Sequence, residues 1–340
     1  MLSKQTDSAN LDYLRSWAVL CVLLDHLAGT SGITLGWLQT LGRVGVLIFF
    51  VHTALVLMFS LERSYPVRGW VTAFYVRRAF RVYPLVFACT LAAVVFGIPG
   101  WPFSHPLSVS PWMFLVNVLL VQNITLSPSI LLVSWSLPYE IQMYLVLPCL
   151  FWMVKRSSKP WLVVTLCLLP ALVLPRVLDF AHFARISSLV QFVPCFLAGI
   201  LAFALPGKRS IPAVVWIVGL PLFLLLASLL AGAEMRKGIQ YGLCLLLGSV
   251  IPFLKEIGNP WLKRAAHLIA KYSYGIYLSH LPAIWLALHL SRLWQRYCAT
   301  AVLLVALPVL LFHLIEDPMI RYGKVLTMVR GQGSQSYQAQ

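Results

Sequence analysis

Apolar stretches of spanning length, separated by short polar loops, repeat along the whole chain. Ten of them are long enough to cross a ~30 Å hydrocarbon core as helices, at residues 11–29, 44–61, 82–99, 138–154, 160–178, 187–205, 212–232, 239–254, 272–290 and 297–315. A further run, 112–122, is too short to cross unless the next residues extend it into an eleventh span. We expect segment 105–137 to be a re-entrant or interfacial element. The pattern predicts an all-α, polytopic transmembrane helical bundle.

Composition supports this class. Hydrophobic residues make up 60% of the chain and charged residues 11%, which excludes a soluble globular protein of this length. The first apolar run contains ionisable residues and lacks a clean small-residue cleavage site, so we do not expect a cleavable signal peptide. The seven cysteines are scattered singly and show no metal-ligand spacing, so no metal site is predicted. We expect one membrane domain over 1–330 and a disordered cytoplasmic tail over 331–340.

The basic residues predict the topology. The formal net charge is +16, and the Lys and Arg residues fall mainly in short loops between the apolar runs. With ten spans and a cytoplasmic N-terminus, 19 of them lie inside and 7 outside; with eleven spans the division is 13 to 13. Positive residues concentrate on the cytoplasmic side, so ten spans and two cytoplasmic termini are favoured. The charge is explained by topology and lipid headgroups, so no nucleic-acid partner is expected.

Ionisable residues in the first apolar run are the first candidates for function. Arg15 and His26 are eleven positions apart, which on a helix leaves them within roughly 20° of one face and ~16 Å apart along the axis. Asp12 shares this face, whereas Asp25 points elsewhere. Ionisable groups within a bilayer are costly and commonly functional. Arg15 is therefore expected to pair with Asp12 or to hold a ligand.

A basic segment, VRRAFRVYP over 76–84, is expected in the cytoplasmic loop that opens the third span. Arg78 and Arg81 are three residues apart and share a helical face, with Arg77 beside them. Guanidinium groups arranged in this way bind phosphates with paired hydrogen bonds. The alternative is an ordinary positive-inside anchor. Arginine at all three positions favours a phosphate-bearing ligand.

The segment SWSLPYEIQMYLVLP, over 134–148, places a carboxylate at the start of an apolar span. Glu140 and Gln142 lie among Trp135, Tyr139 and Tyr144. Aromatic residues are expected at a membrane boundary, but a carboxylate just inside it is not. The alternative is a helix-start glutamate stabilised by the helix dipole.

Two segments near the end of the chain also contain polar groups. In KYSYGIYLSH, over 271–280, His280 is expected near mid-membrane, either as a functional residue or simply hydrogen-bonded in the core. In IEDPMIRYGK, over 315–324, we expect a helix stop at which Glu316, Asp317 and Arg321 make local caps and ion pairs.

Together these segments resemble the integral-membrane acyltransferase family 3. The resemblance rests on LDYLRSWAVLCVLLDH, GRVGVLIFFVHTALVL, RRAFRVYP, WSLPYEIQMYLVLP, YSYGIYLSH and EDP, in that order along nearly the whole chain. The second segment departs from the family pattern: Thr53-Ala54, preceded by His52, replaces the usual Ser-Gly, and Leu47 replaces an acidic residue.

The resemblance implies a membrane enzyme that transfers an acyl group, most often acetyl, from cytoplasmic acyl-CoA to a hydroxyl of a carbohydrate or similar acceptor. It implies polysaccharide modification at the bacterial inner membrane. His26 is then the candidate general base or acyl carrier, and Glu140 its partner or an acceptor ligand. The donor-binding candidates are Arg15, Arg77, Arg78 and Arg81, and the acceptor-binding candidates are Trp135, Tyr139, Gln142, Tyr144 and His280. The competing predictions are a transporter or flippase of lipid-linked glycans, which usually shows repeats and broken helices that we do not find, and a non-catalytic scaffold.

Overall fold

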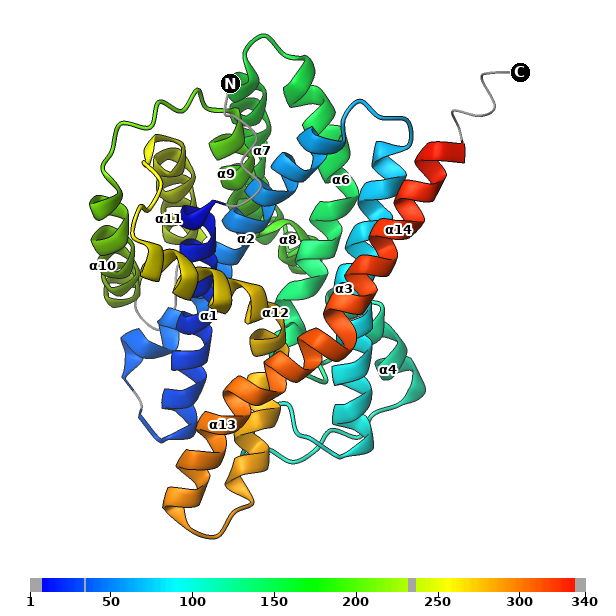
Figure 1. The fold of residues 1–340 in the computed structure, drawn as a ribbon, viewed down its shortest axis with the longest axis vertical. Helices are drawn as coiled ribbons and strands as arrows, with labels where there is room; N and C mark the ends of the chain where they lie inside the picture. The colour runs from blue at the N-terminus through cyan, green and yellow to red at the C-terminus, as the bar shows by residue number, and fades with distance from the viewer. Residues whose placement is uncertain (1–7, 34, 232–236, 334–340) are drawn as a thin grey trace. The chain divides into compact units, whose positions relative to one another are not determined.

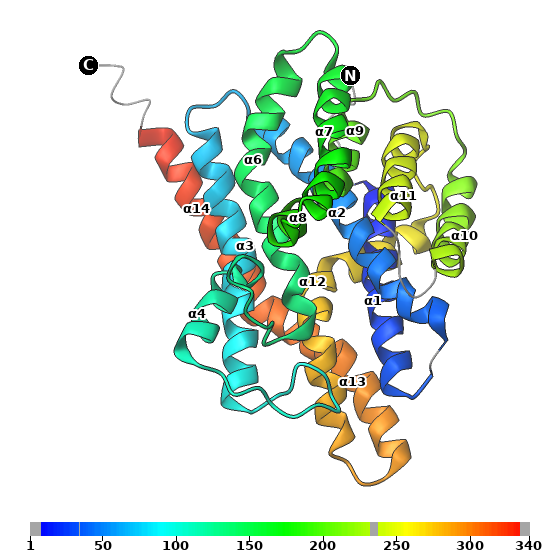
Figure 2. The same ribbon diagram turned by 180° about the vertical axis from the view of Figure 1, so that it is seen from behind.

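The computed structural model describes residues 8–33, 35–231 and 237–333, and the regular secondary structure of the described chain is helical apart from an isolated bridge between Ile211 and Leu254. Figures 1 and 2 show the helices from two sides. In order, they are α1 (Ala9–Thr30), α2 (Gly36–Ser64), α3 (Trp70–Val95), α4 (Pro111–Val118), α5 (Gln122–Thr125), η1 (Leu132–Ser136), α6 (Leu137–Arg156), α7 (Pro160–Phe180), α8 (Ala184–Val190), α9 (Val193–Ala204), α10 (Ala213–Ala231), α11 (Lys237–Val250), η2 (Ile251–Phe253), α12 (Pro260–Leu288), α13 (Leu293–Leu311), η3 (Phe312–Glu316) and α14 (Asp317–Gly333).

Within the described residues, seven helical segments are long and apolar enough to cross a membrane. They are 36–64, 70–95, 132–156, 160–180, 185–204, 213–230 and 293–328. The helices α1 and α12 have spanning length but lie outside this set, and α11 with η2 forms a shorter apolar helix. The all-helical prediction is confirmed. The count of about ten spans stays a prediction.

The chain divides into two compact units. Unit 1 contains residues 1–59 and 145–273, and unit 2 contains residues 60–144 and 274–340. In unit 1, α9 packs against both α7 and α11 (Figure 1). In unit 2, α3 packs against α14 and α4, and it runs beside α14 in both views (Figure 2).

The short elements of unit 2 occupy the segment predicted to be re-entrant or interfacial. Ser110 caps α4 by accepting a hydrogen bond from the Met113 amide at 3.1 Å, and a proline follows at the first helical position, where its missing N–H has no cost. At ~1.5 Å per residue, eight residues give ~12 Å, which is too short to cross a bilayer alone. Leu120 and Leu126 lie on either side of α5, and both have a positive φ, a conformation that leucine rarely adopts.

Two expectations about helix boundaries were wrong. The basic segment 76–84 lies inside α3, which begins at Trp70, and is not a loop. The IEDP segment does not end the last helix, because α13 continues through the π-helical turn η3 into α14. Pro318 is tolerated there for two reasons. It follows a π-helical turn, in which the regular α-helical hydrogen bonds are already interrupted, and it stands at the start of a new helix. Residues 334–340 of the expected tail lie outside the described residues.

Candidate functional site

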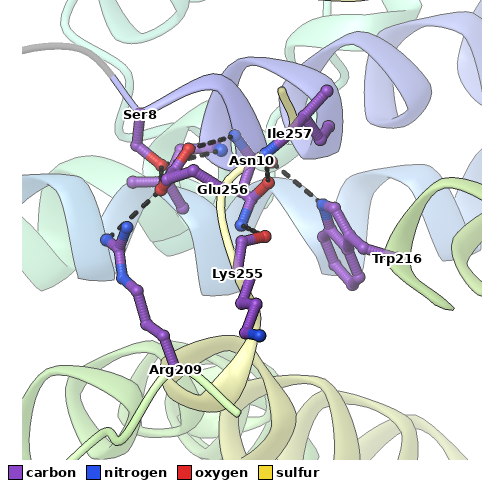
Figure 3. A network of polar contacts seen from close by, with 8 residues as sticks. Ser8, Asn10, Arg209, Trp216, Lys255, Glu256 and Ile257 are labelled. Carbon is purple, nitrogen blue, oxygen red and sulfur yellow. Dashed lines mark hydrogen bonds and ion pairs between the residues drawn. The ribbon is translucent and has the colours of Figure 1, made fainter. Parts of the chain in front are cut away.

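The N-terminus of α1, the helix that contains Arg15 and His26, is held by a distant carboxylate of unit 1. Glu256, between η2 and α12, accepts hydrogen bonds from the Ser8 hydroxyl at 2.8 Å and from the backbone N–H of Asn10 at 3.3 Å (Figure 3). Arg209 forms an ion pair with the same carboxylate at 3.3 Å. A negative charge at a helix N-terminus stabilises it through the exposed N–H groups. The contact therefore anchors the start of α1.

The buried Asn10 side chain completes this anchor. Its amide group donates to the Lys255 carbonyl at 3.1 Å, and its oxygen accepts from the Ile257 amide at 3.1 Å (Figure 3). The Trp216 indole donates to the Asn10 carbonyl at 3.4 Å. Asn10 thus joins α1 to the segment before α12 and to α10, and neither contact is visible in a local sequence pattern.

Arg15 and His26 lie on α1 as the helical spacing predicts. The helix is continuous from Ala9 to Thr30, so both residues share one face. The Arg15 Nε donates to the Ser273 hydroxyl at 2.6 Å, and Asp12 contacts His267 at 3.0 Å. Unit 1 therefore brings α1 and α12 together through polar side chains.

His52 is a unit 1 residue that the sequence did not single out as a candidate. It is 4% exposed, lies on α2, and lies within electrostatic range of the Arg15 guanidinium. Its signal in the sequence was its place directly before Thr53-Ala54, where the chain departs from the family pattern. Asp25 lies elsewhere, against Gly42 of α2, which leaves no space for a Cβ atom there.

In unit 2, the three arginines of the basic segment have different surroundings. Arg81 forms an ion pair at 2.9 Å with Glu316, whose side chain is fully buried. Arg77 and Arg78 each have a buried Nε atom without a hydrogen-bond partner among the described residues. The expected local role of Glu316 was wrong, because its partner lies far away in sequence on α3. Arg321 does form the local pair, with Asp317 at 2.7 Å.

Arg77 and Arg78 line a cavity of about 860 Å³ in unit 2. Its wall comes from the end of α2, the loop 65–69, the first turns of α3, and α14. The five cations that line it are Arg63, Arg68, Arg77, Arg78 and Lys324. Hydroxyl groups of Ser60, Ser64, Thr72 and Thr327, and the rings of Trp70 and Phe80, also line it. A pocket with this lining can hold an anion.

Glu140 lies in the first turn of α6, and its carboxylate accepts a hydrogen bond from the Tyr144 hydroxyl one turn later. Both groups lie within electrostatic range of Arg78. The carboxylate is thus oriented within unit 2 by a tyrosine and faces the positive charge of α3. Glu140 lies at the start of a helix and also within range of charge on another helix. Stabilisation by the helix dipole and a role in a binding site are therefore both compatible with its position.

The other residues of the predicted acceptor group also lie in unit 2. Gln142 donates to the Asn123 side chain at 3.1 Å, and the rings of Trp135 and Tyr139 are 6.3 Å apart, edge to face. His280 is 1% exposed, and its Nδ1 lies 2.9 Å from the Ile276 carbonyl one turn earlier. This contact matches the hydrogen-bonded core histidine that we weighed as an alternative.

Two tyrosines of α12 fix the surroundings of these residues. The Tyr277 hydroxyl donates to the Val133 carbonyl at 2.6 Å and lies 2.8 Å from the Ser136 hydroxyl. The Tyr274 hydroxyl donates to the Val82 carbonyl of α3 at 3.0 Å. These contacts join the KYSYGIYLSH segment of α12 to α3 and to η1.

The structure thus groups Arg77, Arg78, Arg81, Glu140 and the acceptor candidates within unit 2, and places Arg15 and His26 in unit 1. In the part of the chain that is described, no group of three or more His, Cys, Asp or Glu residues is arranged to hold a metal ion. The pocket residues missed by sequence reasoning are Arg63, Arg68 and Lys324. Sequence reasoning could not assign Lys324 to the pocket, because this residue lies far from α3 along the chain.

Comparison with known proteins gives a family match over most of the chain. A model of the acyltransferase domain family, Acyl_transf_3, matches residues 8–314. The peptidoglycan O-acetyltransferase OatA of Listeria monocytogenes is 25% identical over 374 aligned positions, covering 92% of this chain and 56% of that protein. The putative peptidoglycan O-acetyltransferase YrhL of Bacillus subtilis is 24% identical over 354 positions, covering 92% of this chain and 55% of that protein.

A third relative, the acyltransferase MdmB of Streptomyces mycarofaciens, is 31% identical over 161 positions, covering 43% of this chain and 40% of that protein. The chain thus spans about half the length, or less, of the curated relatives it matches. No solved structure matches it significantly. The family match extends from residue 8, just before α1, to residue 314 in η3, and it includes every segment that carried the resemblance except the terminal EDP, so the chain belongs to the Acyl_transf_3 family of acyltransferase domains.

Proposed function

We propose that this protein is an integral-membrane O-acyltransferase that moves an acyl group, most often acetyl, from acyl-CoA to a hydroxyl of a carbohydrate. The observation that carries the proposal is the basic pocket of unit 2, where Arg77 and Arg78 present buried guanidinium nitrogens without partners among the described residues. Phosphate groups of a CoA donor would satisfy them with charge-assisted hydrogen bonds. Two relatives named for peptidoglycan O-acetylation support a cell-wall glycan as the first acceptor to test.

His26 is the proposed general base. In the reaction, the acceptor oxygen attacks the thioester carbonyl carbon, the C–S bond breaks, and CoA leaves as its thiol. His26 takes the proton from the acceptor hydroxyl and returns it to the departing sulfur, so protons balance over one turnover. The imidazole is half-buried on α1, and an imidazole in its neutral form can accept a proton as a base must. A transient acyl group on His26 remains the alternative within the same proposal.

The remaining residues receive supporting roles in the same proposal. Arg15, which donates to Ser273 and lies near His52, would fix the polar side of α1 and contact the donor. Glu140, oriented by Tyr144, would bind or orient acceptor hydroxyls together with Gln142. Arg81, paired with Glu316, is proposed to position α3 while Arg77 and Arg78 hold the donor.

The proposal places the protein in a bacterial inner membrane with ten spans and both termini in the cytoplasm. This topology rests on the 19-to-7 division of basic residues. It would put the pocket lined by Arg63 and Arg68 on the side where acyl-CoA is found. The competing function, transport of a lipid-linked glycan, predicts no acyl chemistry.

The test uses purified protein in lipid nanodiscs with acetyl-labelled acetyl-CoA and a peptidoglycan fragment. Wild-type protein should transfer label to the glycan and release CoA. The His26→Ala variant should transfer it about 10²- to 10⁴-fold more slowly, the usual size of a general-base contribution. His105→Ala is the control, because His105 is exposed in the loop between α3 and α4.

Two results would contradict the proposal. Full activity in a well-folded His26→Ala protein would remove the role of that residue. Absence of label transfer by wild-type protein, together with glycan movement across proteoliposomes, would favour the transporter instead.

A further inference from the structure

The basic pocket contains more positive charge than the arginine motif of α3 alone supplies. Arg77 and Arg78 are half-buried, whereas Arg63, Arg68 and Lys324 are exposed at its edge. No carboxylate is among the lining residues within the described chain. Without an anion, five cations in one cavity repel one another, so the pocket favours a ligand with several negative charges.

The two sets of cations match the two phosphate groups of a CoA donor, and this step rests on the proposed function. CoA has a diphosphate between its pantetheine arm and its ribose, and a separate phosphate on the 3′ oxygen of the ribose. A donor whose arm points into the protein places its diphosphate near the inner cations and its 3′-phosphate near the mouth. The 3′-phosphate is a monoester with a charge of about −2 at neutral pH. The exposed cations are therefore available for it.

We propose that Arg63, Arg68 and Lys324 bind the 3′-phosphate and make the pocket select CoA over donors that lack this group. The site combines the end of α2, the loop before α3 and α14, so it depends on residues outside the motifs that carried the family resemblance. A cavity of about 860 Å³ lies within the range of small-molecule sites, roughly 300–1,000 Å³, and the rings of Trp70 and Phe80 can contact a nucleobase.

The same phosphate chemistry is offered by anionic lipid headgroups, which basic pockets at membrane surfaces also bind. The 3′-phosphate assignment predicts discrimination between two soluble nucleotides that differ in one phosphate. A lipid headgroup site predicts no such discrimination and predicts competition by anionic lipid. The two sources are therefore separable by direct binding.

The experiment measures binding of CoA and of dephospho-CoA to the full chain in nanodiscs of phosphatidylcholine, by calorimetry. Wild-type protein should bind CoA about ten- to a hundredfold more tightly, since hydrogen bonds between charged groups are strong. Lys324→Gln and Arg68→Gln should each reduce this preference several-fold while leaving dephospho-CoA binding nearly unchanged. Arg321→Gln is the control, because Arg321 lies on the same helix as Lys324, pairs with Asp317 and is absent from the described lining.

Each outcome decides the assignment. Equal affinities of wild-type protein for the two nucleotides, or no binding of either, would overturn it. So would a preference that survives in both variants. If one variant fails to fold, as judged by its melting curve, the other variant still tests the site.

The outcomes also separate this inference from the proposed function. Acyl transfer without a preference for CoA would leave the enzyme standing and remove the 3′-phosphate subsite. A preference without acyl transfer would keep the nucleotide site and remove the enzyme. Equal binding of the two nucleotides in phosphatidylcholine nanodiscs, together with weaker binding of both in nanodiscs that contain phosphatidylglycerol, would identify a lipid headgroup site.

Discussion

The ion pair between Arg81 and Glu316 gives the clearest contrast among the three arginines of α3. The Glu316 side chain has no exposed surface and that of Arg81 is 24% exposed, with 2.9 Å between the charged groups. A buried carboxylate without a partner is strongly unfavourable. Arg81 is therefore a structural counterion, and the effects of removing it differ in kind from those of removing Arg78.

We predict that Arg81→Ala destabilises unit 2 through Glu316. Removing one partner of a buried pair typically costs about 3–5 kcal/mol, and the partial exposure of Arg81 places the loss toward the lower end. The melting temperature of purified protein should fall, and Arg81→Ala combined with Glu316→Gln should recover part of it. Arg321→Ala, which removes a largely exposed pair, should change stability little.

A wild-type melting temperature in Arg81→Ala would show that Glu316 needs no counterion. The same variants refine donor-binding measurements. Arg78→Ala should weaken acyl-CoA binding at nearly normal stability, so a raised KM in a stable protein is assigned to Arg78 and not to Arg81.

At the scale of elements, glycines set how closely the helices of unit 1 approach. A Cβ atom on Gly248 of α11 would lie 2.2 Å from the Ala198 carbonyl oxygen of α9, and one on Gly199 would lie 2.2 Å from the Val51 carbonyl oxygen of α2. Gly45 of α2 makes a similar contact with α1, at 2.5 Å from a carbonyl oxygen. Small residues let backbones pack closely where lipid offers no hydrophobic driving force.

We predict opposite effects for two glycine substitutions in the same helix. Gly248→Ala must displace backbone, and overpacking of this kind costs about 1–3 kcal/mol. Gly242→Ala meets nothing within 4 Å and gains up to ~1 kcal/mol of helix propensity. Unfolding of the two variants in detergent, followed by circular dichroism, measures the difference; equal stabilities would contradict the close packing of α9 and α11.

The last helical run is longer than the apolar span that the sequence predicted over residues 297–315. The segment 293–328 is a single run of 36 residues, or ~54 Å at 1.5 Å per residue, which is longer than the ~30 Å hydrocarbon core. Its final part is α14, where Gly323 packs on Phe80 of α3 and Tyr322 stacks edge to face with the same ring. This packing keeps the polar end of the run helical and brings Lys324 to the pocket.

At the scale of the whole molecule, the division of basic residues makes a prediction about topology. With ten spans, the loop after α6 lies in the cytoplasm and the loop between α12 and α13 lies outside; with eleven spans, both are reversed. A green fluorescent protein fused after Lys159 should fluoresce, and alkaline phosphatase fused after Arg292 should be active. The reverse pattern at both positions would require an odd number of spans before Lys159 and an even number before Arg292, and it would reject the ten-span model.

The sequence by itself determined what depends on neighbours along the chain. Apolar runs and the spacing of Arg15 and His26, or of Arg78 and Arg81, predicted helices and shared faces, because one turn of helix involves only nearby residues. The order of motifs indicated the family, which the comparison then showed.

Only the tertiary structure decided the partners of these groups. Glu256 reaches Ser8 across 248 residues, Glu316 neutralises Arg81, and Lys324 joins the arginines of the pocket. Contacts of this kind are selected by how apolar helix faces pack and by the need to satisfy buried charge, and neither leaves a period in the sequence. The sequence therefore predicts the helices and the candidate residues. Packing between distant helices determines which charged residue is a counterion and which remains available to a ligand.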